Sequence, residues 1–243
     1  NGLDISKALI APVEDQTYTG SEIKPDLTIT YGATKLIEGK DYTISGYTDN
    51  TNVSTADVPA TITVKGSGVY DGEIKAEFNI VPASIDGAVV DGVEESTQYT
   101  GSAITFTVGG RKLTTADYSI AYKNNTDAST TDKSASVIVT GKGNYTGTKT
   151  VLFEITSKDI SGCTAGAIET QTYTGKEIKP EVTVKDGSRT LVKDKDYTVS
   201  YSSNTNVTTA SSKAKVLITG TGNYKGSLTL TFDIVKQVVK LGD

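Results

Sequence analysis

The feature that most constrains the fold of this chain is an internal repeat, in which the same motifs occur in the same order three times within 243 residues. Each copy contains a Tyr-Thr-Gly segment, an Asp-Tyr pair, a glycine-rich turn that ends in tyrosine, and a phenylalanine eight residues after that tyrosine. The aromatic residues at these positions are Tyr18, Tyr42, Tyr70 and Phe78 in the first copy, Tyr99, Tyr118, Tyr145 and Phe153 in the second, and Tyr173, Tyr197, Tyr224 and Phe232 in the third. Motifs repeated in a fixed order indicate copies of one structural unit.

We predict repeats at residues 1–81, 82–156 and 157–236, followed by a linker or tail at 237–243. The tyrosines of the first two motifs are 19 positions apart in the second copy and 24 positions apart in the other copies, which predicts a trimmed hairpin in the second copy. The first copy has one extra residue in the segment "DYTISGY", and we assign this insertion to Gly46. A single extra glycine in a strand predicts a β-bulge.

Alternation of apolar and polar residues predicts short β-strands joined by turns, as at 228–234 near the end of the third copy. Hairpin signals are present at 184–191, which contains Asp-Gly, and at 108–113, which contains Gly-Gly. No segment has a sustained helical period. Six or seven short strands in about 75–80 residues are typical of an immunoglobulin-like sandwich. The predicted fold is therefore all-β, with three tandem immunoglobulin-like β-sandwich domains arranged as an elongated rod.

The glycine-rich turns at 66–72, 141–147 and 220–226 allow two interpretations. A glycine loop can hold a phosphate, but a dinucleotide-binding loop is followed by a helix whose N-terminus faces the phosphate. An alternating strand pattern follows each of these turns instead. We therefore favour tight hairpins in which glycine supplies a positive φ.

The recurring tyrosines and asparagines also allow structural and functional interpretations. Tyrosines at matched places in every copy are typical of core and corner positions, and a row of exposed tyrosines could instead stack on sugars. Asn50, Asn125 and Asn204 occupy matched loops, for which a shaped turn is the simplest account. A calcium site built from Asp49, Asn50, Asp127 and Asp132 is the alternative.

Composition narrows the chemistry that is open to the chain. There is no histidine, so Ser-His-Asp triads, histidine bases and histidine zinc sites are excluded, and the single cysteine, Cys163, is interpreted as a small buried residue. The net charge is −5 with no basic patch, which argues against nucleic acid as a partner. No apolar run approaches the length of a membrane span, so membrane insertion is not expected. We predict no enzyme activity, catalytic residue, cofactor or metal.

The consensus "YTG-x-x-I-x-P … DY-T-V-S-Y-x-x-N-T-N … I-T-G-x-G-N-Y-x-G … F-x-I" resembles the tandem bacterial immunoglobulin-like (Big/MBG-type) repeats of Gram-positive secreted or cell-surface proteins. The resemblance covers residues 3–236 and is clearest in the third copy. The second copy departs from the consensus, because Phe106 lies near the place of Pro25 and Pro180. The resemblance implies an extracellular location and a spacer, stalk or adhesive array, and it transfers no catalytic residue.

Our functional hypothesis is a semi-rigid spacer or adhesin stalk that presents other modules of the same longer chain. Its joints, "VPAS" at 81–84 and "TSKD" at 156–159, are too short to behave as free coils. The alternative is a binding module that recognises a glycan or a host surface protein through loops or exposed tyrosines. The resemblance also raises a Lys–Asn covalent bond, for which Lys24 or Lys179 with Asn79 are the candidate residues.

Overall fold

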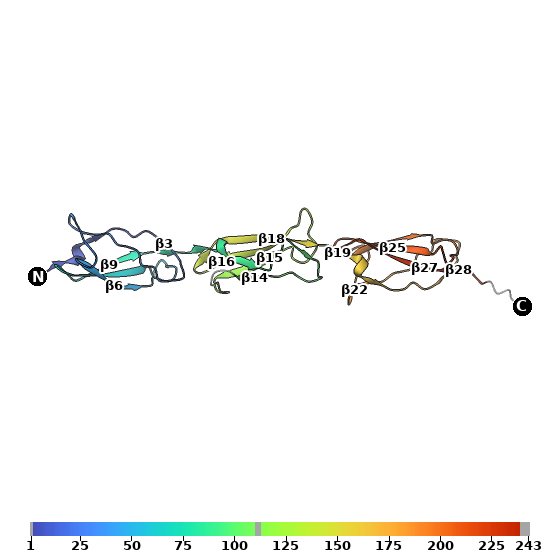
Figure 1. The fold of residues 1–243 in the computed structure, drawn as a ribbon, viewed down its shortest axis with the longest axis horizontal. Helices are drawn as coiled ribbons and strands as arrows, with labels where there is room; N and C mark the ends of the chain where they lie inside the picture. The colour runs from blue at the N-terminus through green and yellow to red at the C-terminus, as the bar shows by residue number, and fades with distance from the viewer. Residues whose placement is uncertain (1, 110–112, 239–243) are drawn as a thin grey trace. The chain divides into compact units, whose positions relative to one another are not determined.

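The computed structural model describes residues 2–109 and 113–238, which form short β-strands (Figure 1). Among these residues the helical elements are three single 3-10 turns, η1 (Ile5–Lys7), η2 (Ile85–Gly87) and η3 (Ile160–Gly162). The prediction of an all-β fold is confirmed. Residue 1, residues 110–112 of the expected Gly-Gly hairpin and residues 239–243 of the expected tail lie outside the described residues.

The described residues form two compact units. Unit 1 comprises Asn1–Asp91, Thr107–Ala121 and Ile138–Thr150, and unit 2 comprises Gly92–Phe106, Tyr122–Val137 and Val151–Asp243. The division into three domains stays a prediction from the sequence.

Fourteen short strands lie entirely within the described residues of unit 1. They are β1 (Leu3–Asp4), β2 (Leu9–Ile10), β3 (Gln16–Thr17), β4 (Ile29–Tyr31), β5 (Thr34–Lys35), β6 (Tyr42–Thr48), β7 (Ala60–Gly66), β8 (Tyr70–Asp71), β9 (Glu73–Phe78), β10 (Ile80–Val81), β11 (Ala83–Ser84), β12 (Val89–Asp91), β14 (Thr107–Gly109) and β17 (Tyr145–Thr146).

The core of unit 1 is centred on β7, which pairs antiparallel with β6 on one side and β9 on the other. Ile62 and Val64 of β7 are fully buried because alternate residues of the strand point to the same face. Ile29 of the small sheet β2-β4-β5 belongs to the same apolar cluster. The two sheets therefore enclose one core, which is a β-sandwich-like arrangement.

Unit 2 repeats this pattern with its own strands. They are β13 (Ser96–Gln98), β19 (Lys158–Asp159), β20 (Thr164–Ala165), β21 (Gln171–Thr172), β22 (Val184–Asp186), β23 (Arg189–Thr190), β24 (Tyr197–Ser202), β25 (Ala214–Gly220), β26 (Tyr224–Lys225), β27 (Ser227–Phe232) and β28 (Ile234–Val235). β25 lies between β24 and β27, and its Val216 and Ile218 are fully buried. Val184 of the sheet β20-β22-β23 joins the same core.

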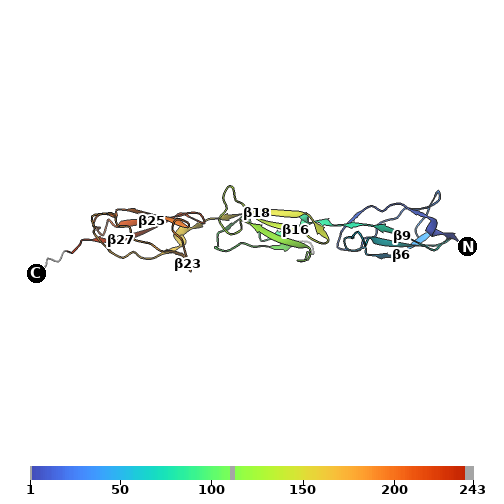
Figure 2. The same cartoon turned by 180° about the vertical axis from the view of Figure 1, so that it is seen from behind.

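Three further strands, β15 (Tyr118–Lys123), β16 (Ala135–Gly141) and β18 (Thr148–Thr156), form a sheet with β13 in the order β13-β18-β16-β15. β16 and β18 lie side by side in both views (Figures 1 and 2). Val137 and Val139 of β16 are fully buried, as the alternation in the sequence predicts.

The glycine-rich turns lead into strands in all three copies, so the phosphate-loop alternative is wrong. The second glycine of each Gly-x-Gly has a positive φ, namely 65° at Gly68, 61° at Gly143 and 62° at Gly222. The first glycine is needed for another reason. A Cβ at Gly141 would lie 2.8 Å from the backbone nitrogen of Thr146, because the chain folds back closely on itself there.

The expected β-bulge is present in β6, but its position differs by one residue. Ile44 pairs with Val64 and Gly46 pairs with Thr63, so the residue without a ladder partner is Ser45 rather than Gly46. The Ser45 hydroxyl donates a hydrogen bond to the Thr63 carbonyl oxygen at 3.2 Å. The Asp-Gly hairpin at 184–191 is also present, since β22 and β23 pair across Gly187, which has a φ of 57°.

Candidate functional site

Both joints between consecutive sequence copies are held by parallel strand pairs. At the first joint, within unit 1, Val81 pairs with Thr17 and Ala83 pairs with Tyr145, which leaves only Pro82 between the two pairs. The second joint, within unit 2, has the same arrangement. There Thr156 pairs with Gln98, Lys158 pairs with Tyr224, and Ser157 is the single residue between them.

An asparagine in the glycine-rich turn adds side-chain hydrogen bonds at the first joint. The Asn144 amide nitrogen donates to the Asn52 side-chain oxygen at 3.0 Å, and the Asn144 side-chain oxygen accepts from the backbone nitrogen of Val53 at 2.9 Å. We call this pair of bonds an asparagine clamp. It joins the turn of the second copy to the loop of the first copy across 92 residues of sequence.

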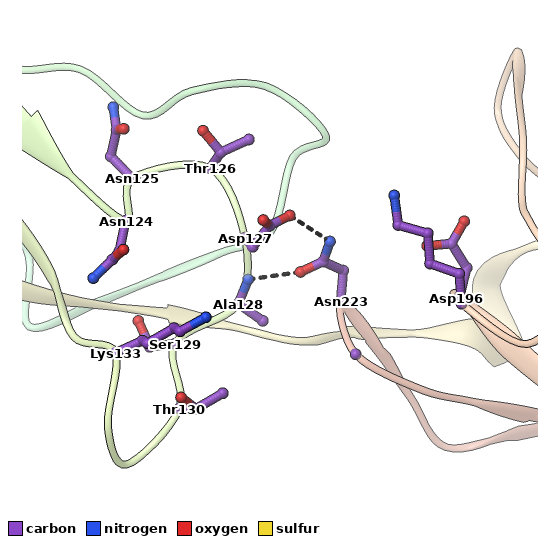
Figure 3. A pocket seen from close by; sticks show the side chains of 12 residues that line it. Asn124, Asn125, Thr126, Asp127, Ala128, Ser129, Thr130, Lys133, Asp196 and Asn223 are labelled. Atoms are coloured by element: carbon purple, nitrogen blue, oxygen red, sulfur yellow. Dashed lines mark hydrogen bonds between the residues drawn. The ribbon is translucent and has the colours of Figure 1, made fainter.

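The second joint has an equivalent asparagine clamp, which Figure 3 shows as two dashed lines. The Asn223 amide nitrogen donates to the Asp127 carboxylate at 2.8 Å, and its oxygen accepts from the backbone nitrogen of Ala128 at 2.7 Å. Asp127 occupies the place of Asn52, so this clamp contains a charge-assisted hydrogen bond.

The same turns also hold the first strand of their own copy. The backbone oxygen of Asn144 accepts from the Ala83 nitrogen at 3.0 Å, and that of Asn223 accepts from the Lys158 nitrogen at 2.9 Å. Each asparagine therefore bonds the joint through its backbone and the preceding copy through its side chain. A single residue thus fixes two segments that meet at the joint.

A pair of tyrosine rings accompanies each clamp. Tyr18 and Tyr145 lie edge to face with ring centroids 5.5 Å apart, and Tyr99 and Tyr224 lie in the same way at 5.7 Å. Edge-to-face packing is a favoured geometry for aromatic pairs. In both cases the ring of a Tyr-Thr-Gly motif packs against the tyrosine ring in the glycine-rich turn of the following copy.

In unit 2 the tyrosine pair extends into a charged network. Lys158 donates to the Asp186 carboxylate at 2.6 Å, and the Tyr224 hydroxyl donates to its other oxygen at 3.1 Å. Arg189 donates to the Tyr99 hydroxyl and lies over the Tyr99 ring, 5.6 Å from its centroid. The Lys158 hydrogen bond holds the pKa of Asp186 below its usual value, and the Tyr224 hydrogen bond acts in the same direction. Burial, reinforced by the Asp186 hydrogen bond, raises the pKa of Tyr224 well above its usual range.

A hollow of about 470 Å³ lies beside the clamp of unit 2 (Figure 3). Most of the side chains that line it are polar, and the lining includes residues 124–130, Lys133 and Asp196. The Asp196 carboxylate accepts from the Val192 backbone nitrogen at 2.8 Å, and the Asp127 carboxylate accepts from the clamp. Both carboxylates are thus engaged in holding turns, and the lining offers hydrogen-bonding groups rather than a paired acid and base.

The twelve aromatic positions of the repeat differ in burial. Eight are buried, three are half-buried, and one is exposed. The buried set is Tyr42, Tyr70, Phe78, Tyr99, Phe153, Tyr197, Tyr224 and Phe232; the half-buried set is Tyr18, Tyr118 and Tyr145; the exposed residue is Tyr173. The Tyr197 hydroxyl donates to the Val182 carbonyl oxygen at 3.2 Å, as a corner tyrosine does. Of these twelve residues, Tyr173 is the most exposed, at 38%.

The loop asparagines act as structural residues. The amide nitrogens of Asn50, Asn125 and Asn204 donate to the carbonyl oxygens of Ile23, Ile104 and Ile178 at 3.0, 2.8 and 2.9 Å. Of the four residues considered for calcium, Asp49 and Asn50 belong to unit 1, whereas Asp127 and Asp132 belong to unit 2. Across residues 2–109 and 113–238, no three acidic, histidine or cysteine side chains gather as metal ligands would.

The residues considered for a covalent Lys–Asn bond have other partners. Lys24 pairs with Glu22 at 2.8 Å and Lys179 with Glu177 at 2.7 Å, and both lysine side chains are more than half exposed. The Asn79 amide donates to Asp15 at 3.2 Å. Cys163 is buried, and this burial raises the pKa of its thiol.

The clamp asparagines were not among the residues that the sequence singled out. A signal for them is present in the second and third glycine-rich turns, which read Gly-Asn-Tyr, whereas the first turn has Val69 in that position. The turn alone does not show that this asparagine forms a clamp, because the loop that bonds its side chain lies about 90 residues away in the sequence. Local sequence patterns do not reveal contacts over that separation.

No protein-family model matches the chain, and a comparison with curated proteins finds no match. Within the described residues, no helix is long and apolar enough to cross a membrane.

Proposed function

We propose that this chain is a non-catalytic spacer, a tandem immunoglobulin-like segment of a secreted or surface-attached bacterial protein that presents other modules of the same longer chain. In this proposal the three sequence copies are three β-sandwiches, and together they make a semi-rigid rod outside the cell.

The observation that carries the proposal is the pairing at the joints. Each joint has one residue outside its strand pairs, and an asparagine clamp ties the loop of one copy to the turn of the next. Bending at such a joint would break strand pairs and clamp hydrogen bonds together. Each lost hydrogen bond costs roughly 0.5–1.5 kcal/mol, so a bend that breaks several is strongly disfavoured.

The composition supports the same proposal. Without histidine the chain lacks the usual base for nucleophilic or general acid–base catalysis, and its one thiol is buried. The carboxylates with the clearest partners, Asp186 and Asp196, are used in hydrogen bonds to neighbouring residues.

Solution X-ray scattering tests the spacer. The matched control carries Gly-Ser-Gly-Ser inserted after Pro82 and after Ser157, which frees both joints. A semi-rigid spacer should give a radius of gyration far above the roughly 18 Å of a compact chain of this length. The control should give a smaller value than the natural chain. A natural-chain value near that of a compact domain, or identical profiles for both proteins, would overturn the proposal.

A second candidate is a binding module for a glycan or a host surface protein, and the exposure of Tyr173 is the observation that favours it. A glycan array probed with the natural chain and with Tyr173→Ala tests this candidate. Reproducible binding that the substitution abolishes would support it, and an array without binding would count against glycan recognition.

A further inference from the structure

The loop of the third copy has the shape of the two loops that receive a clamp. Ser203 has a φ of 53°, compared with 54° at Asp49 and 49° at Asn124. The Asn204 side chain donates to Ile178 in the same way as its counterparts in the other loops. The receiving groups, the Asn206 side chain and the Val207 backbone nitrogen, follow at the matched positions.

These receiving groups have no partner among residues 2–109 and 113–238. Val207 is 38% exposed, whereas Val53 and Ala128 at the matched positions are half-buried. The tyrosine beside the loop of the third copy is also more exposed than its counterpart in the second copy. Tyr173 is 38% exposed, while Tyr99 beside the occupied loop of the second copy is 4% exposed.

We propose that residues 203–208 together with Tyr173 form a docking site for the Gly-Asn-Tyr turn of a further copy of this repeat. The incoming asparagine bonds Asn206 and the Val207 amide, and the incoming tyrosine packs against the Tyr173 ring. The proposal rests on the spacer function and names what binds to the third copy.

The described part of the chain does not supply this occupant itself. Asn144 and Asn223, the two asparagines of the glycine-rich turns, are already engaged in clamps. The first turn carries Val69, whose side chain has no hydrogen-bonding group and is 64% exposed. Two molecules of the chain therefore cannot join end to end through this site, and the donor must be an additional copy with asparagine in its turn.

A tandem extension tests the proposal. Residues 157–236 are attached a second time directly after Val235, so that the added copy begins with its own Ser157-Lys158-Asp159 segment. This junction matters because Asp159 caps the turn η3, whereas Val238 at the matched place has no capping group. In the matched control, the asparagine of the added copy that corresponds to Asn223 is replaced by valine, as Val69 is in the first copy.

Amide hydrogen exchange followed by NMR provides the readout, with Val53 and Ala128 as references in the same molecule. In the extended chain the Val207 amide should exchange about five- to tenfold more slowly than in the natural chain, which is the effect of one hydrogen bond. Tyr173 should also become less reactive toward iodination. In the valine control, Val207 should exchange at its natural rate.

Two results would overturn the inference: an unchanged Val207 rate in the extended chain, or equal slowing in the valine control. If the Val53 and Ala128 amides are protected from exchange, either result contradicts this inference alone and not the proposed spacer function. If those two reference amides are also unprotected, the clamps themselves are absent, and the spacer function fails together with the inference.

Discussion

The side-chain oxygen of Asn223 accepts a hydrogen bond from the backbone nitrogen of Ala128 at 2.7 Å, although 95 residues separate the two in the sequence. The amide nitrogen of Asn223 bonds the adjacent Asp127 at the same time. One side chain thus satisfies two groups of a loop in the preceding copy. Four consequences for stability and pH dependence can be measured.

Replacing Asn223 with valine removes both bonds of the unit 2 clamp. Because one of them is to a carboxylate, we expect the free energy of unfolding to fall by about 1–3 kcal/mol. The Ala128 amide should exchange faster with solvent, while the Val53 amide should be unaffected. Asn144→Val is the matched control, in which the Val53 amide should exchange faster and the Ala128 amide should be unaffected. Equal rates at Ala128 in the natural chain and in Asn223→Val would contradict the clamp.

Asp186 should contribute stability that is lost in acid. The pKa of its carboxyl lies below the ordinary value of 3.8 in the folded chain, chiefly because Lys158 donates a hydrogen bond to it. A lowered pKa stabilises the fold above the unfolded value, and the contribution disappears as pH falls through the folded-state pKa. The stability difference between the natural chain and Asp186→Asn should therefore be largest near neutral pH and shrink below about pH 4. Chemical denaturation of both proteins at several pH values measures this difference.

Tyr224 should make the fold sensitive to alkali. Burial and the hydrogen bond to Asp186 raise the pKa of its hydroxyl above the ordinary value of 10.0. The corresponding stability is present below pH 10 and is lost as pH rises from there toward the folded-state pKa. Tyr224→Phe should be less stable than the natural chain at neutral pH, and the gap should narrow above pH 10. A constant stability gap between Tyr224→Phe and the natural chain across this pH range would refute the assignment.

Two glycines of one turn should respond differently to alanine. At Gly143 nothing lies within 4 Å of an added Cβ, so Gly143→Ala should cost only the strain of a positive φ, about 1–2 kcal/mol. At Gly141 the Cβ would lie 2.8 Å from backbone atoms, which cannot move as a flexible side chain could. Thermal unfolding should therefore show a larger loss for Gly141→Ala, and the opposite ranking would mean that the turn is folded differently.

Periodicity made much of the fold predictable. The alternation that predicted the strands places Ile62, Val137 and Val216 at fully buried positions, because a pleated strand sends alternate side chains to one face. The bulge in β6 was predictable from one extra residue, but its site was not. Ser45 leaves the ladder because its hydroxyl can bond the facing strand, which the glycine beside it cannot do.

The recurring Asp-Tyr pairs illustrate what the sequence left open. The tyrosine was interpreted as a core residue, and Tyr42 and Tyr197 are buried. The role of the aspartate emerges only from the fold. Asp41 and Asp196 accept hydrogen bonds from the backbone nitrogens four residues before them, at 3.0 and 2.8 Å, and so close the turn before the strand.

The candidate site was the least predictable feature. Its hydrogen bonds connect a turn and a loop from different copies, so their partners depend on tertiary structure and not on local pattern. The charged network of unit 2 likewise joins residues that are far apart in the sequence. Arg189 and Tyr99 are 90 residues apart, and the hairpin of the first copy carries Thr34 at the position that matches Arg189.

Val69 gives the repeat array a direction. The turn that contains Val69 has no amide side chain to bond a loop ahead of it, whereas residues 203–208 keep the loop geometry that receives one. Under the proposed docking, a copy added behind the third would be held by a clamp, and a module placed ahead of the first copy would be joined without one. Such an array would grow with all its clamps intact only at its C-terminal end.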